Sequence, residues 1–345
     1  MRPSVLQNVW LRQCSANIPK MKMPRPAAGR MTMRKFNDIL YVTEGVFNET
    51  EGLKQAMKLA AANQVNLDVL LVYPALPKTQ DTYSDSYGKY LQEQLSVELE
   101  KTRQALKFSS DKVPLRVVRQ KVDIPPAIEV IRHVLKEGYD LVIKEAEPGE
   151  NGKGFRSTDM TLLRKCPSAV WLARPVKHDL GKASIAVAVD PETRDSREKA
   201  LSIRLLQLSR SMADAFEGSL SILSCWDYEL EQFLRYKAWA NITEEEQEKN
   251  IREADADHQT SLKALIEESG IGSNHKVHRM RGNPDMLIPE FVEKEDVDIL
   301  VMGTVARTGV LGFLIGNTAE NILSEISCSL MALKPVGFVS PVRAY

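Results

Sequence analysis

The feature that most constrains this chain is an internal repeat. Ile39–Glu44 (ILYVTE) has the same apolar pattern as Ile185–Asp190 (IAVAVD). Pro126–Asp140 aligns without a gap to Pro284–Asp298, which extends the match well beyond one short motif. A repeat on this scale indicates two copies of one folding unit in tandem, with loop insertions between equivalent segments.

The repeat continues to the end of each copy. Leu141–Ile143 corresponds to Ile299–Val301, and Cys166–Pro175 matches the path from Cys328 to Pro335. Both copies therefore carry the same motifs in the same order.

Each copy alternates short β-branched runs with longer helical patterns, which is typical of βαβ units around a parallel sheet. We therefore predict an α/β chain with two doubly wound, five-stranded, Rossmann-like domains in tandem. The runs read as apolar on both faces, so we expect helices to cover both sides of each sheet. Strands are predicted at 37–43, 67–73, 114–119, 140–144 and 169–173, and then at 184–189, 219–225, 275–280, 298–302 and 329–333.

Domain limits follow from composition. We expect a first domain at 34–175 and a second at 182–336, joined by a polar linker that ends at Gly181. Residues 1–33 are interpreted as a disordered or non-native extension, with a transit peptide or a nucleic-acid arm as alternatives. Residues 1–37 carry eight Lys and Arg and no acid, whereas the rest carries 38 basic and 46 acidic residues. Direct nucleic-acid binding by that acidic body is not expected.

The compartment is predicted to be the cytoplasm. No apolar run reaches the roughly 18 residues that span a bilayer. The cysteines Cys14, Cys166, Cys225 and Cys328 are scattered without metal spacing, which is typical of reduced thiols. Cys166 and Cys328 precede predicted strands and are expected to be small buried core residues.

A long charged stretch in the second half is predicted to be helical. It runs from Tyr228 to Glu268, and Thr243 followed by Glu246 forms a capping box that would restart a helix after an interruption. A solvated helix face is the simpler interpretation, and a flap over a ligand groove is the alternative.

A glycine-rich segment after the fourth strand of the second half suggests phosphate binding. Four glycines lie between Gly303 and Gly316, and Asn317 and Thr318 follow at an expected helix start. Glycine lets the backbone approach a ligand closely, and free amides at a helix start supply donors. The alternative is that Asn317 and Glu320 form an ordinary capping box.

Two further residues of the second half point to the same edge of the sheet. Asp190 ends the first strand of this half, and Cys225 ends the second strand. Ligands of open α/β sheets bind outside the carboxyl ends of the strands, where the strand order reverses. Asp190 could accept hydrogen bonds from ribose or adenine, and the backbone of Cys225 could line an adenine pocket.

With these motifs the chain resembles the universal stress protein family, in its tandem-domain branch, over about residues 34–336. The family pattern of glycine, two residues, glycine, nine residues, glycine and a hydroxyl residue falls here on Gly303, Ala306, Gly316 and Asn317, with Thr318 next. Ala306 and Asn317 depart from it. The resemblance implies a stress-response protein associated with resistance to DNA-damaging agents, and possible binding of ATP with magnesium. The implied ligand-binding residues are Asp190, Cys225, Gly303, Arg307, Gly309, Gly316, Asn317 and Thr318.

The first half lacks this loop. Its equivalent segment carries Glu145, Glu147 and Glu150, which would repel phosphates, and Glu44 stands in the place of Asp190. We interpret this half as a scaffold or as a site for something other than ATP. Lys153 and Arg156 are the candidates for an anion there.

The leading functional prediction is therefore a binding module and not an enzyme. One alternative is a slow nucleotide hydrolase or phosphotransferase, for which Asp190 is the only obvious base or metal ligand. Another is a non-nucleotide ligand-binding or chaperone-like scaffold. The sequence shows no GxSxG, GxxxxGK[ST] or HExxH motif in a sensible context. We expect the two domains to pair with each other through their last strands, and a homo-oligomer is also possible.

Overall fold

A computed structural model describes residues 36–45, 51–147, 149–178, 182–193, 195–228, 243–304 and 315–345, all within one compact unit. All ten predicted strands are confirmed, with ends that differ by up to three residues. In the first half they are β1 (Ile39–Thr43), β2 (Leu67–Pro74), β3 (Leu115–Val122), β4 (Leu141–Glu145) and β5 (Ala169–Ala173). In the second half they are β6 (Ser184–Ala188), β7 (Ser219–Trp226), β8 (Lys276–Arg281), β9 (Ile299–Gly303) and β10 (Ser329–Leu333).

The strands form one ten-stranded sheet in the order β3-β2-β1-β4-β5-β10-β9-β6-β7-β8. Each half has the same doubly wound order, and the direction of winding reverses between the first and fourth strands of the half. All pairs within a half are parallel. The predicted fold class is therefore confirmed.

The two halves join through their last strands. β5 and β10 are antiparallel, and Trp171 lies opposite Met331. This is the internal pairing expected from the sequence. Trp171 is fully buried and packs edge-on against Phe216 of the second half, with ring centroids 5.9 Å apart. The core is thus shared by both halves.

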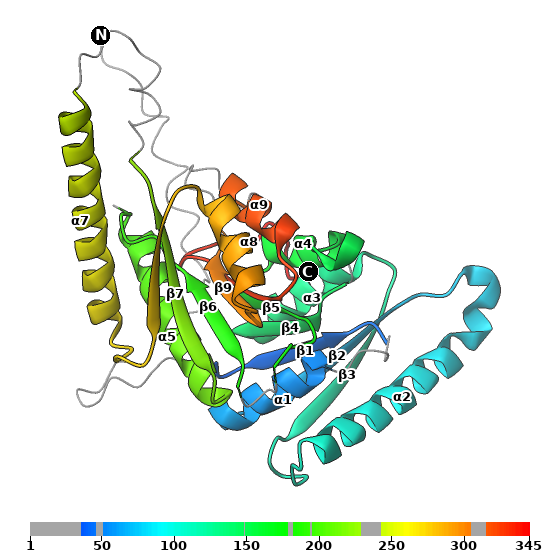
Figure 1. The fold of residues 1–345 in the computed structure, drawn as a ribbon. Coiled ribbons are helices and arrows are strands. Elements are labelled where there is room, and N and C mark those ends of the chain that lie inside the picture. Colours follow the sequence, from blue (N-terminus) through cyan, green and yellow to red (C-terminus); the bar gives the residue numbers. More distant parts are fainter. Residues whose placement is uncertain are drawn as a thin grey trace, which may run out of the picture. The chain divides into compact units, whose positions relative to one another are not determined.

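Helices cover both faces of the sheet (Figure 1). One face packs against α1 (Glu51–Asn63), α2 (Ser84–Ala105), α5 (Ser196–Ala215) and α7 (Glu244–Ser269). The other face packs against α3 (Pro126–Glu137), α4 (Ser157–Lys165), α8 (Pro284–Lys294) and α9 (Asn317–Glu325). Two short 3₁₀ turns, η1 (Lys78–Tyr83) and η2 (Glu150–Gly152), complete the described helical elements. None of the described helices is long and apolar enough to cross a bilayer.

The outer strands differ from the expectation of two apolar faces. β3 and β8 are the sheet edges, and most of their residues are partly or fully exposed. Their sequences place Arg116 and Arg119 on β3 and Lys276 and Arg281 on β8. Charged residues on an edge strand oppose pairing with another chain, which explains why the apolar pattern stops there.

The start of α7 confirms the predicted capping box. The Thr243 hydroxyl accepts from the backbone N–H of Glu246, and the Glu246 carboxylate accepts from the backbone N–H of Thr243, both at 3.1 Å. The predicted helical stretch from residue 229 to 242 lies outside the described residues.

One detail of the repeat needs correction. Ala169 and Ser329 begin the last strands and pair with equivalent residues of β4 and β9, so equivalent positions here lie 160 residues apart. Cys166 therefore corresponds to Ile326 and not to Cys328. Both cysteines are nevertheless buried in the core, as predicted.

Candidate functional site

A row of residues lies at the carboxyl edge of the second half. The parallel pairing of β6 with β7 and β9 places Cys225, Asp190 and Thr304 level with one another at this edge. β6 and β9 are also the strands between which the winding reverses. The structure therefore brings Asp190, Cys225 and Gly303 to the place where open α/β sheets bind ligands.

Asp190 is half-buried and ends its strand in a turn. Its Oδ1 accepts a hydrogen bond from the backbone N–H of Glu192, 2.9 Å away. A carboxylate that bonds its own backbone two residues on holds the chain in a tight turn. The turn fixes the carboxylate beside the sheet edge.

Gly303 ends β9 close to α5. A Cβ atom built on Gly303 would lie 3.0 Å from Cδ2 of Leu201, so glycine allows the strand end and the helix to approach. Thr304 follows and is 1% exposed. Its hydroxyl has no hydrogen-bond partner among the described residues, although buried polar groups are normally paired. The sequence analysis missed Thr304, although its place directly after Gly303 was a usable signal.

The start of α9 supplies the third part of the edge. Gly316 is the N-cap with extended backbone, and no side chain caps the helix. Asn317 is the first helical residue, so the alternative capping box with Glu320 is wrong. The carboxylate of Glu320 instead binds Arg164 of α4 at 2.8 Å. Asn317 and Thr318 are exposed beside backbone amides that have no intrahelical acceptor.

The loop between Thr304 and Ile315 carries the other residues of the predicted phosphate-binding pattern. Ala306, Arg307 and Gly309 lie outside the described residues.

The equivalent edge of the first half is filled by its own charges. Lys144, at the end of β4, is buried, and its Nζ lies 3.2 Å from Asp159, 3.5 Å from Glu147 and 3.7 Å from Glu44. Burial opposes the charge on Lys144, but the three carboxylates outweigh burial and raise its pKa. We call these four residues the Lys144 cluster.

Carboxylates of this half also accept hydrogen bonds from the backbone N–H groups that a bound anion would need. Asp159, in the first turn of α4, accepts from the backbone N–H of Glu147 at 2.8 Å and is fully buried. Glu145 accepts from the backbone N–H of Gly52, in the first turn of α1, at 2.6 Å. Negative side chains are stabilised at helix N-termini, where phosphates also bind. This half thus holds carboxylates where a phosphate would otherwise sit.

Lys144 and Asp159 were missed in the sequence. Lys144 takes the position that Met302 holds in β9, so the repeat itself marked it as different. Of the two predicted anion partners, Lys153 lies 3.9 Å from Glu293 of α8, and Arg156 is the N-cap of α4.

A buried serine and histidine near this edge form a hydrogen bond in the opposite direction to the one that nucleophilic catalysis requires. Ser224 and His258 are 2.9 Å apart, and the Nε of Arg279 donates to Nδ1 of His258 at 3.3 Å. An imidazole that accepts at Nδ1 carries its proton on Nε2, which therefore donates to the Ser224 hydroxyl. Burial, then Arg279, lowers the pKa of His258. This histidine cannot serve as a base for Ser224.

Within the described ranges, no three or more His, Cys, Asp or Glu side chains are arranged to hold a metal ion.

Comparison with known proteins decides the family. The model of the universal stress protein family matches this chain twice, at residues 35–174 and 183–334. The chain belongs to the universal stress protein family. Both copies of the repeat are thus universal stress domains, and the predicted family is confirmed.

Several tandem relatives resemble the chain over most of its length. Universal stress protein E of Escherichia coli K12 is 29% identical over 63% of this chain and 68% of its own. The universal stress protein E homolog of Haemophilus influenzae is 27% identical over 87% and 98%. A solved putative universal stress protein of Pseudomonas aeruginosa superimposes with a TM-score of 0.65, 24% identity, and coverage of 87% and 94%. The solved structure supports the fold.

Proposed function

We propose that this chain is a stress-response protein whose second domain binds an adenine nucleotide, and that it acts as a binding module. Membership of the family supports the stress-response role. The choice of an adenine nucleotide as the ligand, and of the second domain as its binding site, is based on the residues at the carboxyl edge of β6, β7 and β9.

The observation that carries the proposal is the contrast between two equivalent edges. In the first domain Lys144, Asp159 and Glu145 fill the edge with internal ion pairs and hydrogen bonds. In the second domain the equivalent positions hold Met302, Ala319 and Gly303, which carry no charge. A ligand phosphate would meet uncharged groups, backbone amides and the Thr304 hydroxyl there.

Each part of the edge has a chemical task in this proposal. The first-turn amides of α9, with Asn317 and Thr318, would donate to phosphate oxygens. Asp190 would accept hydrogen bonds from ribose hydroxyls, and the backbone at Cys225 would border the adenine. Magnesium would enter with the nucleotide and neutralise phosphate charge.

Calorimetric titration of the full chain with ATP and magnesium tests the proposal. Gly316→Trp places a bulky side chain at the start of α9 and should abolish binding. Arg156→Trp is the matched control, because Arg156 is the N-cap of α4 and lies 160 positions before Gly316. This control should bind ATP like the unmodified chain, with one site per chain.

Other outcomes have definite meanings. Equal loss in both variants would overturn the assignment to the second domain. Magnesium-dependent phosphate release that Asp190→Ala removes would favour the slow hydrolase over the binding module. Survival of a deletion strain after DNA damage, restored by the unmodified chain but not by Gly316→Trp, would link the site to the expected resistance.

A further inference from the structure

The segment that follows β10 lies against the first domain. The Ser340 hydroxyl donates to the carbonyl oxygen of Lys165, at the end of α4, 2.7 Å away. Val342 packs against the core between the sheet and the α3/α4 layer. A chain segment of the second domain thus closes a space on the first domain, far from the edge that carries the proposed nucleotide site.

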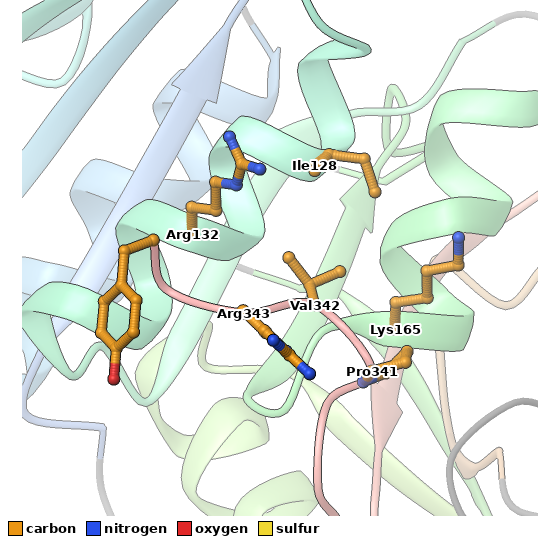
Figure 2. Close-up of a pocket in the computed structure, with 7 residues that line it drawn as sticks. Ile128, Arg132, Lys165, Pro341, Val342 and Arg343 are labelled. Carbon is orange, nitrogen blue, oxygen red and sulfur yellow. The ribbon is translucent and has the colours of Figure 1, made fainter.

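This segment and helices α3 and α4 border an open cavity of about 430 Å³ (Figure 2). Its lining combines cations with apolar groups. The residues are Ile128, Arg132, Lys165, Pro341, Val342, Arg343 and Tyr345. A second hollow of about 310 Å³ shares Arg132 and Tyr345 and adds Glu129, His133 and Lys136.

The charge of the larger cavity is one-sided. Arg132, Lys165 and Arg343 line it, and no Asp or Glu does. In the part of the chain that the structure describes, none of these three cations has an ion-pair partner. By contrast, the buried cation Lys144 of the same domain is matched by carboxylates. The potential of the cavity is therefore positive.

Two buried nitrogen atoms beside the cavity are also unpaired. The Nε atom of Arg132 and the Nε2 atom of His133 are buried, and neither has a hydrogen-bond partner among the described residues. The Nε of Arg132 is always a donor, and leaving a buried, charged donor unpaired is unfavourable, so it indicates that an acceptor binds there. An oxyanion supplies that acceptor and also balances the charge.

The arrangement of charged and apolar side chains in the cavity favours an organic anion. Figure 2 shows Ile128 and Arg132 projecting from α3, with Val342 between Ile128 and Arg343. The cations flank an apolar patch in this view and do not surround one point. A compact inorganic ion would leave that patch in water, whereas an organic anion would cover it.

We infer that this cavity binds a small organic oxyanion, with a phosphate or carboxylate held by Arg132 and an apolar body against Ile128 and Val342, while Lys165 and Arg343 add positive charge around it. Arginine binds both oxyanions through two parallel hydrogen bonds, which accounts for one site accepting either group. The site belongs to the first domain and does not depend on the nucleotide site of the second.

Calorimetric titration of the full chain with phenyl phosphate and with benzoate tests the inference. Phenyl phosphate carries the phosphate form of the ligand chemistry and benzoate the carboxylate form, while benzyl alcohol offers the same ring without charge. At least one of the two anions should bind, more tightly than inorganic phosphate by about tenfold. Benzyl alcohol should not bind.

The decisive variant is the double substitution Arg132→Gln with Arg343→Gln. It should weaken binding of the favoured anion by about tenfold or more. The double substitution Lys89→Gln with Arg119→Gln is the matched control, because it removes the same charge from exposed positions outside the cavity. Thermal unfolding of both variants checks that they fold, and Lys165→Gln tests the same cavity if the first variant does not.

Either of two results would overturn the inference. One is the absence of binding of both anions to the unmodified chain. The other is equal affinity in the cavity variant and the matched control. Binding of ATP at the second domain should be unchanged in all of these variants, which separates failure here from failure of the nucleotide site.

Discussion

Arg174 and Lys334 are equivalent residues that each reach into the opposite half of the chain. Arg174 follows β5 and donates through Nη1 to the carbonyl oxygen of Ile326, at the end of α9, 3.1 Å away. Lys334 follows β10 and donates through Nζ to the carbonyl oxygen of Leu163 in α4, 2.5 Å away. Both side chains are buried. The joint between the domains is therefore closed by two exchanged cations as well as by the β5–β10 pair.

Arg174→Met should destabilise the whole chain. The substitution removes donors to the carbonyl oxygens of Gly152, Gly154 and Ile326 and leaves those carbonyls short of partners. We expect the free energy of unfolding to fall by about 2–4 kcal/mol. Urea unfolding followed by tryptophan fluorescence measures the loss. Lys177→Met, which breaks the exposed pair with Asp296, is the control and should have a much smaller effect.

The effect of Asp159→Asn on the free energy of unfolding should become more favourable as the pH rises. Burial raises the pKa of Asp159 from 3.8 to about 6. Between these values the folded chain keeps a proton that the unfolded chain has released, so this group makes the free energy of unfolding fall with rising pH. Asparagine does not titrate. The free energy of unfolding of the unmodified chain, relative to that of the variant, should therefore be about 1–3 kcal/mol lower near pH 7 than near pH 4.

Chemical denaturation at both pH values measures that difference. A stability difference that does not change between them would mean that Asp159 ionises over the same range in the folded and unfolded chains.

Gly303→Ala should be coupled to Leu201. The added Cβ would lie 3.0 Å from Cδ2 of Leu201, so the leucine must move. We expect a loss of about 1–3 kcal/mol in the unmodified background. In a Leu201→Ala background the same change should cost little, because the conflicting methyl group is gone. A double-mutant cycle of unfolding free energies checks this, and additive effects of the two substitutions would contradict the close approach.

The Cys166 and Cys328 thiols should be unreactive in the folded chain because both are buried. Burial raises the pKa of Cys166 to about 11 and that of Cys328 to about 12, and both are almost fully enclosed. The thiolate is the reactive form, and near pH 8 only about one Cys166 thiol in a thousand and about one Cys328 thiol in ten thousand is ionised. Iodoacetamide should leave both cysteines unmodified in the folded chain and modify them after unfolding. Mass spectrometry of digests distinguishes the sites, and rapid labelling of Cys328 in the folded chain would refute its burial.

The sequence predicted the architecture because the relevant signals are local or repeated. Each strand has its own apolar run, and the repeat relates Ile39 to Ile185 without knowledge of the fold. The capping box of Thr243 and Glu246 spans three residues, so it too could be recognised directly. Asp190 and Gly303 could be predicted to lie at one edge because Gly303 ends β9 and Asp190 follows β6, and the carboxyl ends of parallel strands gather at one edge.

The missed features depend on side chains that come together from separate segments. Lys144 and Asp159 lie on different elements and gain meaning only when α4 packs beside β4. The cavity of Arg132 and Arg343 forms only because a segment about two hundred residues further along the chain returns to α3. The capping role suggested for Asn317 failed because the helix begins one residue earlier than that role requires.

The antiparallel contact between β5 and β10 has a consequence for how the two domains can diverge. Where two identical subunits pair in this way, any substitution appears at both sites at once. Here the partners are encoded separately on one polypeptide, so the first copy can carry Lys144 where the second carries Met302. The covalent link makes the pairing obligatory and fixes its stoichiometry. One domain is then free to give up a ligand and serve as a permanent, dedicated partner of the other.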